Sequence, residues 1–242
     1  MTSPEGWQQW ACDADRLAAL AEFAAGAGHE INNPLATIIG RAQQLLREES
    51  DPRRRQSLAI IAAQAYRIRD MIGDVMLFAR PPQPEMRPVS LPQTLRGVID
   101  RLAADLAAAR CRVEFPPGDA ADLPPREDIL VLADPAQFAV VASELLRNAA
   151  QALQPAGGVI RVDFSADERF AQWAVIDHGK GFTDHERRHA FDPFFSGRQA
   201  GRGLGFGLCK AARIVDLHGG SIAIESAEGG PTVVTVRWPR QL

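Results

Sequence analysis

The segment RPPQPEMRPVSLP, residues 80–92, holds five prolines in thirteen residues. Proline fixes φ at about −65° and has no backbone N–H, so a run of this kind is stiff, extended and non-helical. It predicts a boundary between two domains, with residues 81–89 as the linker. Before this segment the sequence has the period of long helices, and after it helical and strand patterns alternate.

Two long helices are expected within residues 1–80. Their apolar residues recur in alternating steps of four and three, which is typical of a coiled-coil or bundle seam. The first run consists of Leu17, Ala21, Ala24, Gly28, Ile31, Leu35, Ile38, Ala42 and Leu45, and the second of Leu58, Ile61, Ala65, Ile68, Ile72, Val75 and Ala79. Between the runs, Asp51 and Pro52 stop one helix and start the next, which predicts an αα-hairpin.

A two-helix hairpin has apolar surface that it does not cover by itself. The simplest solution is the association of two copies, so we expect a homodimeric four-helix bundle. The alternative is that the second half of the same chain covers this surface.

A mixed domain is expected over residues 90–242. The expected helices lie near residues 92–109, 135–153 and 205–217, and the expected strands near 111–115, 129–133, 158–166, 170–179, 220–227 and 232–239. Asp134 followed by Pro135 is a strong helix start. The stretch from residue 179 to 203 is poorly periodic, and no regular element is expected there. The pattern predicts a two-layer α/β sandwich with a mostly antiparallel sheet.

Composition limits the class of protein. The chain has 242 residues, of which 46% are hydrophobic and 24% charged, and its formal net charge is −3. This balance is that of an average soluble domain and gives no reason to expect a nucleic-acid partner. No apolar run reaches the length of a membrane span, no signal-peptide pattern is present, and three widely spaced cysteines suggest neither a disulfide framework nor a zinc site. We expect a cytoplasmic location, either as a free protein or as the cytoplasmic portion of a larger membrane-bound one.

The segment AGHEINNPLATI, residues 27–38, places a histidine beside a glutamate on the first helix. His29 lies next to the apolar seam and should reach solvent. Glu30 could hold the tautomer of the imidazole and accept its proton, so His29 is a candidate nucleophile, with an ordinary surface histidine as the alternative. Asn33 follows His29 by one helical turn. A metal site is disfavoured, because no second histidine or cysteine stands one turn away.

Pro34 stands inside the same predicted helix, where a proline costs about 3 kcal/mol. Its ring displaces the carbonyl group of Glu30, so we expect a bending point one turn beyond His29. The alternative is that packing in the bundle compensates for the proline.

Three clusters in the second half indicate a nucleotide site, and they are ELLRNAAQAL (144–153), VIDHGKGF (175–182) and GRGLGFGL (201–208). Glu144 and Asn148 share a helical face, and an asparagine oxygen suits Mg²⁺. Asp177 ends a strand and could accept a hydrogen bond from an exocyclic amine such as that of adenine. Glycines at a helix start let backbone amides approach a phosphate. Neither the P-loop nor the dinucleotide-binding pattern is matched.

These segments resemble a known family. HEINNPL, ELLRNAAQAL, DHGKGF, FDPFFSGR and GRGLGFGL are similar, in order, to the H, N, G1, F and G2 boxes of bacterial sensor histidine kinases. The first is most similar to nitrogen-regulation-type kinases. The resemblance covers about residues 12–239. It implies a dimerisation and phosphotransfer hairpin followed by a Bergerat-type ATP-binding domain, the fold shared with gyrase, Hsp90 and MutL.

The resemblance also implies roles for individual residues. His29 would be the phosphoacceptor, Glu30 its acid/base, and Asn33 the residue that positions water to dephosphorylate the regulator. Asn148 would bind Mg²⁺ and Asp177 the adenine amine. The glycines that would shape the pocket are Gly179 and Gly181, and the residues of the lid and its phosphate contacts are Gly201, Gly203, Leu204 and Gly205.

Four positions depart from the family pattern. Glu144 replaces an asparagine, and in gyrase-like relatives a glutamate there is a general base for water, so some ATP hydrolysis is conceivable. His178 also replaces an asparagine. Arg198 replaces a lysine and keeps its charge, and it can bind phosphate in a bidentate manner. Arg202 replaces a threonine and either adds charge near the γ-phosphate or points to solvent.

The expected function is that of an ATP- and Mg²⁺-dependent kinase that phosphorylates its own His29 and passes the group to an aspartate of a response regulator, with phosphatase activity toward that regulator. The alternatives are an ATP-gated dimeric scaffold and a gyrase-type ATPase that uses Glu144. Residues 1–28 are too few for a sensor domain, so we expect sensing to reside in another segment or another protein.

Overall fold

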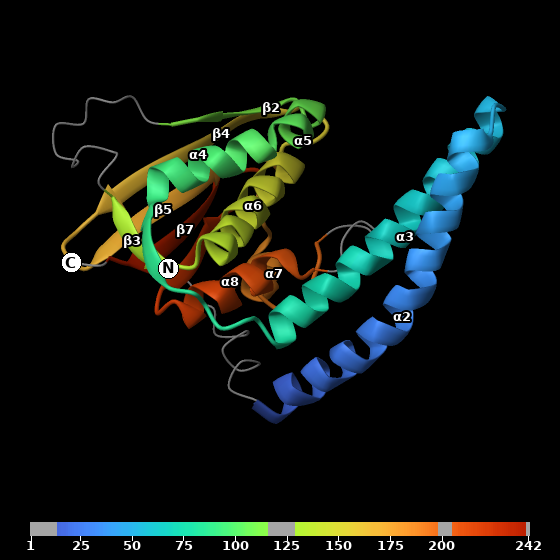
Figure 1. The fold of residues 1–242 in the computed structure, drawn as a ribbon. Coiled ribbons are helices and arrows are strands. Elements are labelled where there is room, and N and C mark those ends of the chain that lie inside the picture. Colours follow the sequence, from blue (N-terminus) through green and yellow to red (C-terminus); the bar gives the residue numbers. More distant parts are fainter. Residues whose placement is uncertain (1–13, 116–128, 198–204, 241–242) are drawn as a thin grey trace. The chain divides into compact units, whose positions relative to one another are not determined.

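The computed structural model describes residues 14–115, 129–197 and 205–240 (Figure 1). They form two compact units, a helical unit that ends at Pro82 and a sheet unit that begins at Gln83. This division falls inside the stretch expected to be a linker. The second half of that stretch is not free of structure, because Arg87–Ser90 form strand β1.

The helical unit consists of α2 (Ala14–Glu48) and α3 (Pro52–Ala79), which lie side by side as an antiparallel hairpin (Figure 1). Asp51 caps α3, and its side chain accepts hydrogen bonds from the backbone amides of the second and third residues after it, at 3.0 and 2.9 Å. The Arg55 side chain donates to two carbonyl oxygens at the end of α2, at 2.7 and 2.8 Å. The predicted hairpin is therefore confirmed, together with the cap that produces it.

The apolar seam divides between two surfaces. One set of small and branched side chains is buried inside the hairpin, and it comprises Ala24, Leu35, Ile39, Ala42, Ala62 and Ala65. A second set from the predicted seam stays exposed, namely Ile38 at 44%, Leu45 at 51%, Ile61 at 49% and Ile68 at 42%. The exposed pair on each helix is spaced by seven residues, as a second helical contact requires. The seam prediction was too broad, because periodicity does not separate the contact within a hairpin from a contact with another copy.

Helix α2 continues without interruption through Pro34. Pro34 lies on the exposed side of the helix, and Figure 1 shows α2 curved along its length. Proline inside a helix is a recognised cause of bending. Whether the helix bends further during function stays a prediction.

The sheet unit contains a five-stranded sheet in the order β2-β4-β5-β7-β6. Its strands are β2 (Cys111–Glu114), β4 (Gly158–Ala166), β5 (Phe170–Asp177), β6 (Ser221–Ser226) and β7 (Thr232–Pro239). Only β2 and β4 pair in parallel. Strand β1 pairs with β3 (Leu130–Ala133) in a separate two-stranded sheet.

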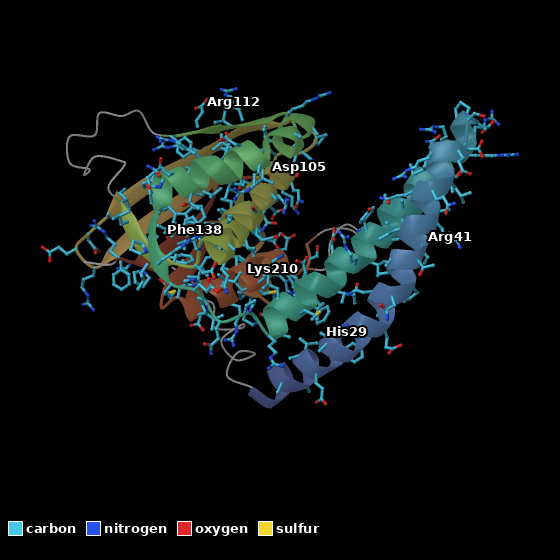
Figure 2. The ribbon with its side chains drawn as sticks, in the orientation of Figure 1. His29, Arg41, Asp105, Arg112, Phe138 and Lys210 are labelled. Carbon is cyan, nitrogen blue, oxygen red and sulfur yellow. The ribbon has the colours of Figure 1, made fainter. Side chains whose placement is uncertain are left out.

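Helices cover one face of the five-stranded sheet (Figure 1). They are α4 (Leu91–Arg101), α5 (Ala103–Ala108), α6 (Pro135–Ala152), α7 (Asp184–His189) and α8 (Gly207–Leu217). Alternate residues of β5 are buried, which is the pattern of a strand with one covered face. The ring of Phe138 on α6, labelled in Figure 2, packs against Trp173 and Trp238 at centroid distances of 5.8 and 5.1 Å. The predicted two-layer α/β sandwich with a mostly antiparallel sheet is confirmed.

Three local details differ from the predictions. The helix expected over 92–109 divides at Leu102 into α4 and α5. The helix expected from residue 205 begins at Gly207. Helix α7 lies in the stretch where none was expected, and it starts with a capping box between Thr183 and Glu186. That box was visible in the sequence, but a six-residue polar helix has too few apolar residues for a period.

Within the described ranges, no helix combines the length and the apolar character needed to cross a bilayer.

Candidate functional site

His29, labelled in Figure 2, lies on the exposed surface of α2, as expected. Glu30 and Asn33 are exposed as well. The preceding residue, Gly28, is buried. A Cβ added to Gly28 would lie 3.1 Å from the Met76 sulfur and 3.3 Å from a methyl carbon of Ile72. Glycine thus lets α3 approach α2 closely directly beside the imidazole, which supports the backbone of His29 without covering its ring.

Asp177 lies at the end of β5 and is only 4% exposed. Its Oδ1 accepts a hydrogen bond from the Gly179 N–H at 2.9 Å. Burial raises the pKa of the Asp177 carboxyl, although the hydrogen bond from Gly179 and the neighbouring His178 act in the opposite direction. A buried carboxylate at the end of a strand can accept a further hydrogen bond from a ligand amine.

Two polar residues that were not predicted lie on the same face of the sheet as Asp177. Thr232 of β7 is directly opposite Asp177, and Ser226 of β6 is directly opposite Thr232. The two hydroxyl groups are 2.8 Å apart, and the Ser226 hydroxyl also accepts a hydrogen bond from the Phe182 N–H at 3.1 Å. In the sequence, these two residues could have been found only as polar residues at inward-facing positions of a strand. That pattern is informative only once the register of the strands is known.

The loop after Asp177 is held between α6 and the β6–β7 turn. A Cβ on Gly179 would lie 2.6 Å from the carbonyl group of Ala152. Gly181 has φ of +68°, and a Cβ there would collide with the Ala227 carbonyl oxygen. The Lys180 backbone N–H donates to Ala152 O at 3.3 Å. These two glycines are therefore required by close backbone approach.

Glu144 and Asn148 face the start of α8 from adjacent turns of α6. A Cβ on Gly207 would lie 2.7 Å from Glu144 Oε2 and 3.6 Å from Asn148 Nδ2, so glycine leaves the room that both side chains need. Lys210, one turn further along α8 and labelled in Figure 2, forms an ion pair with Glu144, with Nζ 2.9 Å from Oε1. The sequence prediction did not include Lys210, because no local pattern indicated its partner.

The described part of the F-box segment, residues 191–197, packs against residues 205 and 206, which directly precede α8. Phe194 has φ of +66°, and its ring contacts that of Phe206 at a centroid distance of 4.7 Å. Gly205 has φ of +73°, and a Cβ there would collide with the Phe195 backbone. The Lys180 side chain donates to Gly197 O at 3.4 Å.

Several residues that the sequence analysis singled out in the F and G2 boxes lie outside the described residues, and they are Arg198, Gly201, Arg202, Gly203 and Leu204. His178 is exposed beside Asp177.

Comparison with protein families explains why these features occur in one chain. The family of His Kinase A (phospho-acceptor) domains matches residues 19–84. The family described as Histidine kinase-, DNA gyrase B-, and HSP90-like ATPase matches residues 133–242. The chain belongs to the histidine kinase family. The hairpin is the part that matches the phospho-acceptor family, and most of the sheet unit matches the ATPase family.

Curated histidine kinases align along almost the whole chain. The histidine-protein kinase AtoS of Escherichia coli (strain K12) is 28% identical over 239 residues, which is 99% of this chain and 38% of AtoS. The sensor histidine kinase ZraS of Klebsiella oxytoca is 29% identical over 93% of this chain and 47% of its own length. The chain thus spans less than half the length of these relatives. Neither is described as a nitrogen regulator, and that narrower resemblance stays a prediction.

Solved structures of histidine kinases have the same fold. Full-length ShkA in complex with AMPPNP has a TM-score of 0.75 at 20% identity, over 91% of this chain and 46% of that chain. Histidine kinase ThkA in complex with response regulator protein TrrA has a TM-score of 0.64 at 23% identity, over 94% of this chain and 64% of that chain. At these identities the likeness confirms the hairpin and the sandwich.

The groups around Asn148 fit a magnesium ion in this kinase core. Mg²⁺ prefers oxygen ligands, and its sites next to nucleotides take one or two from the protein and the rest from phosphates and water. Asn148 is half-buried and carries an amide oxygen, and Gly207 leaves space beside it. In the part of the chain that the structure describes, no three His, Cys, Asp or Glu side chains form a metal cluster.

Proposed function

We propose that this chain is the core of an ATP-dependent protein-histidine kinase that acts as a homodimer, phosphorylates His29 and transfers the phosphoryl group to an aspartate of a response regulator. The observation that carries the proposal is that one chain combines an exposed His29–Glu30 pair on a hairpin with a sandwich that matches the ATPase family and contains the buried Asp177 and the half-buried Asn148. The proposed domains are 1–80 for dimerisation and phosphotransfer, 81–89 for the linker and 90–242 for ATP binding.

Each site residue has a part in holding the nucleotide. The buried Asp177 carboxylate accepts a hydrogen bond from the adenine amine, and Gly179 and Gly181 let the backbone pass close to the base. Asn148 would contribute its amide oxygen to Mg²⁺, and Glu144 borders the same space. When bound, Mg²⁺ would neutralise charge on the phosphates. The residues proposed to contact the phosphates are Arg198, Gly201, Gly203, Leu204 and Gly205.

The transfer step needs few chemical groups from the protein. A ring nitrogen of His29 forms a bond to the γ-phosphorus, while the bond from that phosphorus to the bridging oxygen breaks and ADP leaves with the electron pair. Glu30 accepts the imidazole proton. Positioning and charge neutralisation supply most of the catalysis in reactions of this kind.

The partners follow from the exposed surface of the hairpin. The uncovered side chains of Ile38, Leu45, Ile61 and Ile68 suit a second copy of this chain. A receiver domain would bind near His29, and the relative ThkA was solved with a response regulator. Asn33, one turn from His29, would position water during dephosphorylation of the regulator. Because ATP is a cytoplasmic substrate, we also place this core in the cytoplasm, with any membrane attachment supplied by a sensor region.

Incubation with γ-labelled ATP and Mg²⁺ tests the proposal. The wild-type protein should acquire a label that is stable in base and labile in acid, and His29→Ala should abolish it. His185→Ala, which changes another exposed histidine, is the matched control and should keep the label. Phosphate release without any label would favour the gyrase-type ATPase, and neither label nor release would favour the scaffold.

A further inference from the structure

The ion pair between Lys210 and Glu144 is a buried feature to which the proposed function assigns no role. The Lys210 side chain on α8 is 5% exposed, the Glu144 side chain on α6 is 17% exposed, and Nζ lies 2.9 Å from Oε1. Lysine is almost never buried to this extent unless it is paired.

Glu144 stands where a carboxylate could promote a competing reaction. It lies one helical turn from Asn148, and Gly207 is adjacent to both side chains. A carboxylate beside bound ATP could accept a proton from water while the water oxygen forms a bond to the γ-phosphorus. The bond from that phosphorus to the bridging oxygen would break, ADP would take the electron pair, and inorganic phosphate would form in place of phosphohistidine.

The geometry leaves Glu144 poorly placed for that reaction. Its Oε1 is bound to the Lys210 ammonium group, and its Oε2 faces α8, where a Cβ on Gly207 would lie only 2.7 Å away. We propose that Lys210 is a positioning residue that holds the Glu144 carboxylate against α8 and away from water, so that the γ-phosphoryl group reaches His29 instead of being lost to hydrolysis. This inference rests on the proposed kinase function.

A purely structural role for the pair predicts a different result. Removing one partner of a buried ion pair destabilises a protein, because the other charge is left uncompensated. Loss of Lys210 would then weaken folding and nucleotide binding, but it would not create a hydrolytic reaction that depends on Glu144.

The experiment measures phosphate release from Mg²⁺-ATP by the full chain carrying His29→Ala, so that hydrolysed phosphohistidine does not contribute. In this background, Lys210→Met should raise the rate of release about tenfold or more. General bases accelerate reactions by about a hundredfold or more, so this rise is at the low end of what a freed Glu144 could produce. Lys210→Arg keeps the charge and should stay at the parent rate. Lys210→Met combined with Glu144→Gln should lose this rise, because the base is removed. Lys210→Gln is a second uncharged variant and should behave like Lys210→Met.

A second measurement needs no nucleotide. If the two side chains are coupled, the variant that carries both Lys210→Met and Glu144→Gln should melt no lower than the less stable of the two single variants. Additive losses in the melting temperature would contradict the coupling.

Three outcomes would overturn the inference. One is a folded, ATP-binding Lys210→Met or Lys210→Gln protein that releases phosphate at the parent rate. Another is a rise in release that persists in the Glu144→Gln combination. The third is failure of both uncharged variants to fold, which would make the pair structural. Failure of the kinase function itself is distinct, because the chain with His29 intact would then acquire no label.

Discussion

Gly181 and Gly229 have nearly the same backbone conformation but different surroundings. Their φ angles are +68° and +69°, yet a Cβ on Gly181 would collide with the Ala227 carbonyl oxygen, whereas a Cβ on Gly229 would meet nothing within 4 Å. A side chain at positive φ costs about 1–2 kcal/mol in either place. Only Gly181 adds a steric cost, so the two sites separate conformational strain from close approach.

We expect Gly181→Ala to lower the free energy of unfolding by about 2–4 kcal/mol, as the sum of strain and overpacking. Gly229→Ala, the matched control, should cost about 1–2 kcal/mol, from strain alone. Urea denaturation followed by tryptophan fluorescence measures both. Equal losses would show that contact with Ala227 does not matter.

Replacement of Asp177 should have opposite effects on ATP binding and on the stability of the fold. Burial raises its pKa above the ordinary value of 3.8, so the carboxyl is harder to ionise in the folded protein than in the unfolded chain. Its contribution to stability is therefore full below that ordinary value and is lost as the pH rises through the folded pKa. At neutral pH, ionisation of Asp177 opposes folding.

Asp177→Asn should accordingly raise the melting temperature at pH 7 and reduce the loss of stability between acid and neutral pH. It should also weaken ATP binding about tenfold to a hundredfold, because a charged acceptor for the adenine amine is lost. Thermal unfolding and titration with ATP measure the two effects. Asp163→Asn on β4 is the control for a general effect of removing a carboxylate. A variant that loses stability and keeps ATP affinity would contradict both expectations.

At the scale of elements, one histidine joins the end of α8 to the start of α6. His218 Nε2 accepts a hydrogen bond from the Asp134 N–H at 3.1 Å, and Nδ1 lies 2.8 Å from Ile214 O. Both bonds are made by a neutral imidazole that donates from Nδ1. Burial lowers the pKa of His218 below its ordinary value of 6.5, although Ile214 O and the Asp134 carboxylate act in the opposite direction.

The pH dependence of stability follows from this shift. Between the folded pKa and 6.5 the unfolded chain binds a proton at this residue more readily than the folded protein does, so stability falls as the pH drops through 6.5. We expect His218→Gln to flatten this decline in a series of denaturation curves from about pH 7.5 to pH 5.5. An unchanged slope would exclude His218 as its source, and His178→Gln serves as the exposed control.

Helix α2 contains two residues that weaken a helix for different reasons. Pro34 removes a backbone hydrogen bond, whereas Gly40 is exposed, and a Cβ added there would meet nothing within 4 Å. Pro34→Ala should stabilise the helical unit by about 3 kcal/mol at most. Gly40→Ala should stabilise it by about 1 kcal/mol.

If Pro34 is a bending point, its replacement should also change the rates of autophosphorylation and dephosphorylation severalfold, while Gly40→Ala should leave them near wild type. Rates that stay unchanged in Pro34→Ala would leave the hinge without support. Circular dichroism melting and labelled-ATP assays provide the two measurements.

Elements with strong local signals agreed with the sequence prediction. Asp51 and Asp134 cap α3 and α6 as predicted, because a cap depends on the next three residues only. Helix α7 was missed because it is short and polar. Strand β1 was missed because its pairing with β3 is a long-range contact inside a proline-rich stretch.

At the scale of the whole molecule, the exposed apolar side chains on the hairpin predict its assembly. Ile61 is 49% exposed on α3 and Leu130 is 42% exposed on β3 of the sheet unit. A charge in an apolar contact between helices is costly when it is buried without a partner. We expect Ile61→Glu to convert the protein from dimer to monomer in light-scattering measurements.

Leu130→Glu is the matched control, since it changes a similarly exposed apolar side chain outside the hairpin, and it should remain dimeric. A dimer that persists in Ile61→Glu would place the interface elsewhere on the chain. A monomeric Leu130→Glu would instead involve the sheet unit in assembly.

The sequence by itself determined the hairpin, the sandwich and the order of the site segments. These features rest on helical period, capping residues and glycines at turns, which act over a few residues and are visible in the chain. The tertiary structure decided which seam residues stay exposed, that Thr232 faces Asp177, and that the buried Lys210 holds Glu144. Such contacts depend on strand register and on helix packing between distant segments. The role of a buried charged side chain can be inferred only when its partner is known.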